Sequence, residues 1–228
     1  MAYFIYNEID SRKMGVILKS LPPITRPNRR IEKITVPGRN GTLTVDEGAY
    51  DSITISLQCY LKPGYDPRKI TKWLEPSGTI TFSDEEDKYY NARIVNSIPL
   101  ARVFRIVREF IIQLELQPFA YSKEIFVKKY KTGVAHTFVI DEATANMYPY
   151  IKIAGSGEID LTINGNTMII KPDEYVELDC ELQIAYKGEK SENDKVYGAF
   201  FSLVPGRNTI SIFGEYSELE IKYRKMYL

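Results

Sequence analysis

The sequence contains a single histidine, His136, and any serine or cysteine hydrolase built on this chain would depend on it. A catalytic triad needs a histidine that takes the nucleophile's proton and an acid that orients that histidine. His136 begins the apolar-rich run 136–140, which reads as a strand, and no G-x-S-x-G nucleophile motif occurs in the sequence. We therefore predict a strand histidine without a catalytic task.

The two cysteines, Cys59 and Cys180, are the other residues with reactive potential. Each continues an alternating apolar row: Ile53, Ile55 and Leu57 before Cys59, and Val176 and Leu178 before Cys180. Cysteines in phase with such a row usually behave as small buried hydrophobic residues. A disulfide would have to span two domains and is not expected, and one histidine with two in-strand cysteines does not predict a zinc site.

Three further clusters could bind ions or phosphate. The acidic run Asp84–Asp87 lacks the spaced ligands and the glycine of a calcium loop, so a solvated hairpin tip is favoured. Gly155–Gly157 is placed between strands and lacks the remaining positions of a phosphate loop. Arg102, Arg105 and Arg108 recur every three residues and could meet phosphate, but an edge facing solvent or a neighbouring subunit is favoured.

No catalytic, cofactor-binding or metal-binding residues are therefore predicted, and the chain is not expected to be an enzyme. A pair of glycosidase carboxylates leaves no spacing signature among 30 acidic residues, so a hydrolase is kept as a third hypothesis, behind the two given below.

Charge and hydropathy exclude several partners. The 30 basic and 30 acidic residues give a formal net charge of zero, so no bulk field attracts nucleic acid or an anionic membrane. The first residues have no basic start and no long apolar run, which argues against a signal peptide. No stretch has the roughly 18 apolar residues of a membrane helix. A protein made in a cytoplasm, with no membrane and no sequence-specific nucleic acid partner, is expected.

The hydrophobic pattern has period two almost throughout and predicts an all-β protein with one short helix. Strands are expected over 31–36, 42–45 and 52–60, with the turn Pro37–Gly41 between the first two. A helix is expected near 67–75, because Asp66 suits the N-cap, Pro67 suits the first helical position, and Ile70, Trp73 and Leu74 share one face. Such a short helix needs tertiary packing of Trp73. Strands over 79–83, 89–96 and 110–116 follow, and 98–108 is expected to form a projecting hairpin or loop.

From about Pro149 the strands are short and the turns frequent, which is typical of a β-sandwich. Asn164-Gly165 predicts a hairpin after the row Ile159, Leu161 and Ile163. Further strands are expected over 168–170, 175–182, 199–204, 209–213 and 219–223. A boundary in the lysine-rich stretch 123–133 gives two domains, 1–130 and 131–228. The five residues Val36–Asn40 recur as Val204–Asn208, which we interpret as a coincidence of turn chemistry.

Taken in order, these features resemble the siphophage distal tail protein family. The N-terminal features are Phe4–Asn7, Asp10, Gly15, Leu21–Ile24, Val36–Gly41, Tyr50, the helix with Trp73-Leu74, Gly78–Asp84, Tyr89-Tyr90 and Leu116–Tyr121. The C-terminal features are Pro149–Ile153, Asn164-Gly165, Leu178–Cys180 and Leu203–Asn208.

The resemblance implies an N-terminal β-sandwich or split-barrel domain, followed by a galectin-like β-sandwich. It further implies a hexameric ring of N-terminal domains around a channel for DNA, placed at the virion tail tip between the tail tube protein and a tail-tip or tail-associated lysin protein. A ring uses head-to-tail contacts, so two different patches of each domain must fit each other. A neutral or acidic channel is expected, because each lysine–phosphate contact would slow DNA.

The alternative function is a carbohydrate-binding module that recognises host surface glycans through the C-terminal sandwich. Sugar sites usually present clustered aromatic residues beside polar groups, whereas the tyrosines here are scattered along the sequence. They are Tyr148, Tyr150, Tyr175, Tyr186, Tyr197, Tyr216 and Tyr223.

Overall fold

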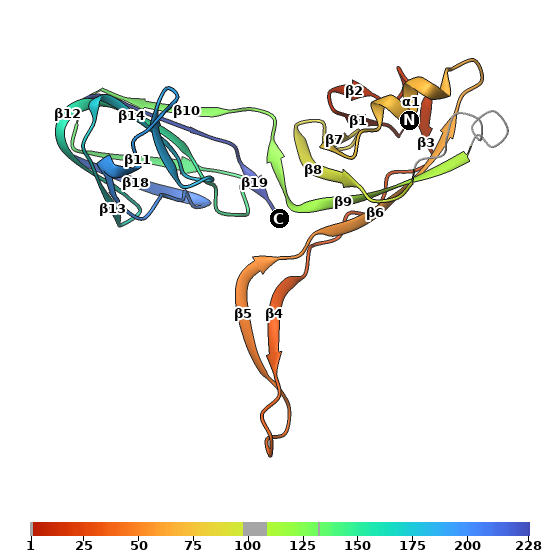
Figure 1. Cartoon of the computed structure of the whole chain (residues 1–228), viewed down its shortest axis with the longest axis horizontal. Coiled ribbons are helices and arrows are strands. Elements are labelled where there is room, and N and C mark those ends of the chain that lie inside the picture. Colours follow the sequence, from red (N-terminus) through yellow and green to blue (C-terminus); the bar gives the residue numbers. More distant parts are fainter. Residues whose placement is uncertain (1, 98–108, 132) are drawn as a thin grey trace. The chain divides into compact units, whose positions relative to one another are not determined.

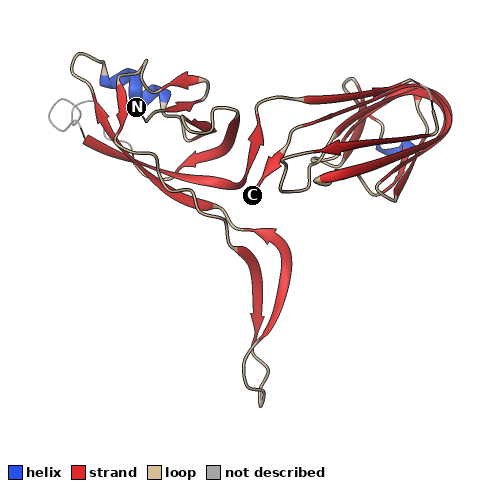
Figure 2. Cartoon of the chain, turned by 180° about the vertical axis from the view of Figure 1, so that it is seen from behind, coloured by secondary structure: helices blue, strands red, loops and turns tan. Residues whose placement is uncertain are grey.

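The chain forms two compact units in a computed structural model that describes residues 2–97, 109–131 and 133–228 (Figure 1). The first unit comprises Met1–Ala120 with Leu228, and the second comprises Tyr121–Tyr227. Strands dominate both units, which confirms the all-β class (Figure 2). The expected hairpin or loop at 98–108, with its three arginines, lies outside the described residues.

The first unit is built on a curled antiparallel sheet in the order β2-β1-β7-β8-β9-β6-β3. Its longest pairing joins β6 to β9, in register from Ile53↔Leu116 to Tyr60↔Glu109. The alternation seen in the sequence decides which face is buried: Ile55, Leu57 and Cys59 all point into the core. The strands are β1 (Phe4–Tyr6), β2 (Ile9–Asp10), β3 (Val16–Leu18), β6 (Ile53–Leu61), β7 (Ser77–Phe82), β8 (Lys88–Ile94) and β9 (Glu109–Ser122).

The helix α1 (Pro67–Trp73) closes one end of this core. Asp66 caps it as expected, because its carboxylate accepts a hydrogen bond from the Arg68 backbone N–H at 3.0 Å. Trp73 anchors it: the indole Nε1–H donates to the Tyr6 carbonyl at 2.9 Å, and its ring stacks on Phe4 with centroids 5.7 Å apart. The required packing of Trp73 is thus present, and the helix ends within the expected range 67–75.

A two-stranded hairpin leaves this sheet. It consists of β4 (Arg29–Ile34) and β5 (Leu43–Tyr50), which among the described strands pair only with each other. Figures 1 and 2 show it projecting from the rest of its unit, and every residue from Asn28 to Gly48 is exposed. We call it the arm.

The second unit is a β-sandwich whose two layers share two long strands, β12 (Tyr150–Ile163) and β18 (Gly206–Tyr223). The first half of β12 lies with β10, β14, β15 and β16, while its second half lies with β11, β13 and β17. The remaining elements are β10 (Phe126–Tyr130), β11 (Ala135–Ile140), β13 (Asn166–Ile170), β14 (Asp173–Asp179), β15 (Ile184–Lys187), β16 (Lys190–Ser191), a 3-10 turn (Asn193–Lys195), β17 (Val196–Gly198) and β19 (Met226–Tyr227).

A glycine corner bends the two shared strands from one layer to the other. The β12–β18 register shifts after Ala154 and again between Ser156 and Asp160. A Cβ on Gly155 would lie 2.3 Å from the Glu215 carbonyl oxygen, and one on Gly214 would lie 2.5 Å from the Glu158 carbonyl oxygen. The backbones therefore approach so closely that only glycine fits. Gly155–Gly157 was expected between strands, but it lies within β12, because the strand bends here instead of ending.

The structure corrects two further expectations. Residues 199–204 are not a strand, and of these only Leu203 pairs, through an isolated bridge to Met147. The expected strands 209–213 and 219–223 are parts of the single strand β18, whose 18 residues continue through the glycine corner. The second unit begins at Tyr121, and its strand β10 pairs with β18.

The two Val-Pro-Gly-Arg-Asn segments have different environments. The first lies in the exposed loop of the arm. In the second, Asn208 is fully buried: its Oδ1 accepts from the Val204 N–H at 2.9 Å and from Asn164 Nδ2 at 2.8 Å, and its Nδ2 donates to the Val204 carbonyl at 2.9 Å. The same five residues thus form an exposed turn in one place and a buried, hydrogen-bonded turn in the other.

Gly214→Ala tests the glycine corner. We expect it to destabilise the second unit by roughly 2–4 kcal/mol, because it combines a steric clash with a left-handed φ of +118°. Gly157→Ala is the matched control: its φ of +73° is also positive, but a Cβ there meets no atom within 4 Å, so it should cost only about 1 kcal/mol.

The measurement is guanidinium unfolding followed by circular dichroism and by tryptophan fluorescence. The only tryptophan, Trp73, lies in the first unit, so the fluorescence midpoint should stay unchanged. Equal effects of the two substitutions would contradict the crowded corner.

Candidate assembly surfaces

His136 has a structural environment. Its ring stacks on Tyr130 with centroids 4.1 Å apart, and Nε2 is buried without a hydrogen-bond partner among the described residues. A general base needs both a nucleophile within reach and an orienting acid. No hydrogen bond of the His136 side chain to a serine, cysteine or carboxylate is found within the described ranges. His136 lies in β11 (Ala135–Ile140), so it is a strand residue as predicted.

The cysteines are buried, as expected, with 1% of Cys59 and 2% of Cys180 exposed, and both are free. Burial raises the pKa of each thiol to about 12. The nucleophile in cysteine chemistry is the thiolate, which neither side chain forms near neutral pH. Neither cysteine is therefore placed to act as a nucleophile.

Asp84–Asp87 form the turn between β7 and β8, which confirms the hairpin tip. Glu85 accepts from Lys88 at 2.9 Å, and Glu86 accepts from the Tyr3 hydroxyl. Over residues 2–97, 109–131 and 133–228, no cluster of three or more candidate ligands could hold a metal ion.

The arm has one face with an apolar strip. The opposed pair Ile34↔Leu43 and the neighbouring Val45 share this face, with Glu32 opposed to Val45 at its edge. The other face carries Ile31, Lys33, Thr44 and Asp46. The three apolar residues are 39–44% exposed. Ion pairs gather nearer the base, where Arg29 contacts Asp46 and Arg30 contacts Asp51 at 3.3 Å. An isolated hairpin is marginal in water, so this strip is a candidate contact surface.

The outward face of β6 and β9 is uncharged or acidic along most of its length. Ser56↔Gln113 and Thr54↔Glu115 are opposed pairs, and both positions of each pair alternate with core residues. At one end Lys19 pairs with Glu109 at 2.9 Å, so its charge is balanced.

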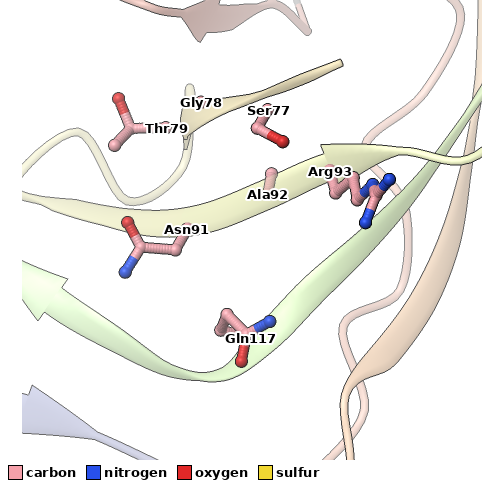
Figure 3. Close-up of a pocket in the computed structure, with 7 residues that line it drawn as sticks. All are labelled: Ser77, Gly78, Thr79, Asn91, Ala92, Arg93 and Gln117. Carbon is pink, nitrogen blue, oxygen red and sulfur yellow. The ribbon is translucent and has the colours of Figure 1, made fainter.

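A shallow hollow of about 490 Å³ lies over β7, β8 and β9. Figure 3 shows its polar rim, formed by Asn91, Arg93 and Gln117, with Ser77 and Thr79 across β7. Its lining contains neither a histidine, a cysteine nor a carboxylate, so it offers no acid–base pair.

One outward face of the sandwich is closed by an alternating charge ladder. The row Lys129–Glu220–Lys152–Glu177 crosses β10, β18, β12 and β14 in register. Hydrogen bonds from Lys129 and Lys222 lower the pKa of Glu220. Partial burial acts to raise the pKa of Glu177, but hydrogen bonds that include one from the Tyr150 hydroxyl at 2.7 Å lower it overall. The charged side chains of this face are therefore paired with one another.

The seven C-terminal tyrosines do not form one platform. Tyr223 is buried, Tyr150, Tyr175 and Tyr186 lie near the charge ladder, and the Tyr216 hydroxyl donates to the Gly133 carbonyl at 2.6 Å. Tyr148 and Tyr197 are exposed. The sequence analysis did not single out the exposed Phe213, although its position out of phase with the buried Ile210 and Ile212 was a usable signal.

Comparison with known proteins decides the nature of the first unit. Residues 11–116 match the family model of the phage tail protein RIFT-related domain. Most of the first unit is thus similar to a phage tail RIFT-related domain. No curated protein matches the sequence.

Among solved structures, the whole chain is similar to the crystal structure of the SPP1 Dit protein. The likeness covers 100% of both chains at a TM-score of 0.72 with 12% identity, and at that identity it shows the fold. SPP1 Dit is described as a paradigm of the hub adsorption apparatus in phages that infect Gram-positive bacteria. The phage tail domain is thus followed by a sandwich in a chain of Dit fold, which confirms the resemblance to distal tail proteins. No helix in the described part of the chain is long and apolar enough to cross a membrane.

Thiol reactivity tests the environment of the two cysteines. In the folded protein at pH 8 neither thiol should react with Ellman's reagent, and both should react after unfolding in guanidinium. Rapid labelling of the native protein would contradict their burial.

The same pKa shifts predict a pH dependence of stability. An unfolded thiol has a pKa of about 8.5, and the folded-state values are about 12. The folded state therefore holds these protons more tightly. Its stabilisation is complete below about pH 8.5 and is lost as the pH rises toward 12.

Proposed function

We propose that the protein is a structural hub subunit at the distal end of a siphophage tail, joining the tail tube protein to a tail-tip or tail-associated lysin protein. The observation that carries this proposal is the phage tail domain with its projecting arm, in a chain that shares the fold of a known hub protein along its whole length. The protein would be made in the bacterial host cytoplasm and would act in the virion tail tip.

The arm supports assembly into a ring of N-terminal domains, with six copies as the resemblance implies. In a ring each subunit uses two different patches, one received and one presented. The arm is the patch that each subunit would present: its apolar strip is exposed, and its backbone pairs with no other strand of the described residues. Packing this strip on the adjacent copy would remove the apolar side chains from water and stabilise the hairpin.

The role is assembly without catalysis. The thiols are buried and held protonated, and His136 is stacked against Tyr130. The functional surfaces are instead the arm, the polar hollow and the outward face of β6 and β9.

We assign that outward face of β6 and β9 to the channel wall. Hydroxyl, amide and carboxylate side chains line it together with the exposed Ile111, and Lys19 is paired with Glu109. A wall of this kind makes few contacts with phosphate and lets DNA slide, whereas lysines repeated in every copy of a ring would add affinity at each step.

Leu43→Asp tests the arm. A carboxylate in the apolar strip should raise the subunit dissociation constant roughly tenfold or more, because the charge would be desolvated in the contact. Thr44→Asp is the matched control on the opposite face of the same strand and should have a much smaller effect. Light scattering over a concentration series, with electron microscopy of the particles, measures both. Rings that form equally well with Leu43→Asp would contradict this role of the arm.

Affinity for DNA tests the channel assignment. Labelled duplex DNA should show no saturable binding to the full chain by fluorescence anisotropy, at low or physiological salt. Tight binding that falls steeply with the logarithm of salt concentration would reveal a phosphate-binding surface and contradict the proposed wall.

A further inference from the structure

The second outward face of the sandwich, opposite in character to the charge ladder, carries an aromatic row. Phe213 on β18 is in register with Asp160 on β12, Asp160 with Ile169 on β13, and Ile169 with Tyr197 on β17. All four side chains point away from the core, because their neighbours Ile159, Leu161, Ile170 and Ile212 are buried. We call these four residues the aromatic row.

The two rings at its ends are unusually open to water. Phe213 is 59% exposed and Tyr197 is 55% exposed, and neither stacks on another ring among the described residues. Lys171 approaches the Tyr197 ring at 5.6 Å while pairing with Glu158 at 3.1 Å. Unlike the charge ladder, the row leaves apolar ring surface without a partner.

Asp160 lies between the rings with incomplete hydrogen bonding. Its side chain is half-buried, and its Oδ1 is shielded from solvent and accepts no hydrogen bond within the described residues. A shielded acceptor without a partner has lost its hydration and gained nothing in exchange, so this carboxylate is a polar group of the row that the fold itself does not explain.

A row of hydroxyl groups runs alongside. Ser211, Thr162 and Thr167 occupy the next outward positions of β18, β12 and β13, with Thr162 in register with both of the others. The Thr162 and Thr167 hydroxyls share a hydrogen bond of 2.8 Å. These groups can both donate and accept, so they match a ligand that does the same.

We propose that the aromatic row binds a neutral oligosaccharide. A hexose has apolar C–H faces that stack on exposed rings and hydroxyl edges that bond to carboxylates and hydroxyls, and this face offers both at neighbouring positions. Phe213 and Tyr197 are three strand spacings apart, about 14 Å, so a short oligomer and not a single sugar is needed to reach both rings.

The chemistry disfavours the other occupants. An anionic glycan or phosphate would meet the Asp160 carboxylate, while Lys171, which lies over the Tyr197 ring, is paired with Glu158. A protein partner usually buries a contiguous apolar core, but here Asp160 separates the Phe213 ring from the rest of the row. The inference is independent of the hub role, since it concerns a face of the C-terminal unit and not the phage tail domain.

The experiment probes a glycan array with the labelled full chain. The array holds a neutral set, made of hexose and N-acetylhexosamine oligosaccharides, and an anionic set, made of uronic acid and phosphorylated oligosaccharides. Binding to the neutral set is expected. Calorimetry with the best neutral oligomer should then show roughly tenfold weaker binding for Phe213→Ala and for Asp160→Asn. Tyr148→Ala is the matched control, because Tyr148 is 51% exposed in the same unit but outside the row.

Each outcome decides the proposal. Circular dichroism melting should be unchanged in all variants, because none of these side chains is in the core, and this separates lost binding from lost folding. Neutral binding that Phe213→Ala and Asp160→Asn weaken and Tyr148→Ala leaves alone supports the site. The proposal is overturned if the chain does not bind the neutral set, if it prefers the anionic set, or if Tyr148→Ala loses as much affinity as the row variants. The row would then be a protein contact. Ring assembly is measured separately, so failure here leaves the hub role standing.

Discussion

Side chains alternate along a β-strand, so burying one face leaves every second residue pointing outward. This constraint organises both units. The inward rows supply the cores almost without exception, as Ile53, Ile55 and Leu57 do in β6. Function must then be carried by the outward rows. They differ sharply among themselves: polar on β6 and β9, ion-paired on the charge ladder, apolar on one face of the arm, and aromatic at Phe213 and Tyr197.

Much of the inward half was predictable from sequence. The alternation placed both cysteines in the core, and the pattern around Asp66, Pro67 and Trp73 predicted the helix and the need to pack its tryptophan. These predictions succeed because they depend on neighbours within a few residues. The resemblance to distal tail proteins depended on the order of many such local features, which is why it survives at 12% identity to SPP1 Dit.

The outward half was less predictable, because it depends on pairing between distant strands. The row from Phe213 to Tyr197 joins residues from four strands, and the sequence shows them only as isolated aromatic and acidic residues. The glycine corner was not predicted from the sequence either. Glycine usually marks a break in a strand, so 155–157 was placed between strands; the close approach of Gly155 to Glu215 shows that glycine here lets the strand continue. The exposure of the arm likewise follows from the absence of other strands beside it.

The position of β18 sets the order in which the chain can fold during synthesis. It pairs with β10, β11 and β12, all of which precede it by many residues, and it runs through both layers of the sandwich. The second unit therefore has no complete layer until Gly206–Tyr223 has left the ribosome. Almost all of the first unit, in contrast, has been synthesised once the chain reaches Ala120. Until then the growing chain exposes unpaired strand edges, and nascent copies on one messenger could associate through them. A chain of this topology is therefore most exposed to misassociation during synthesis of its last hundred or so residues.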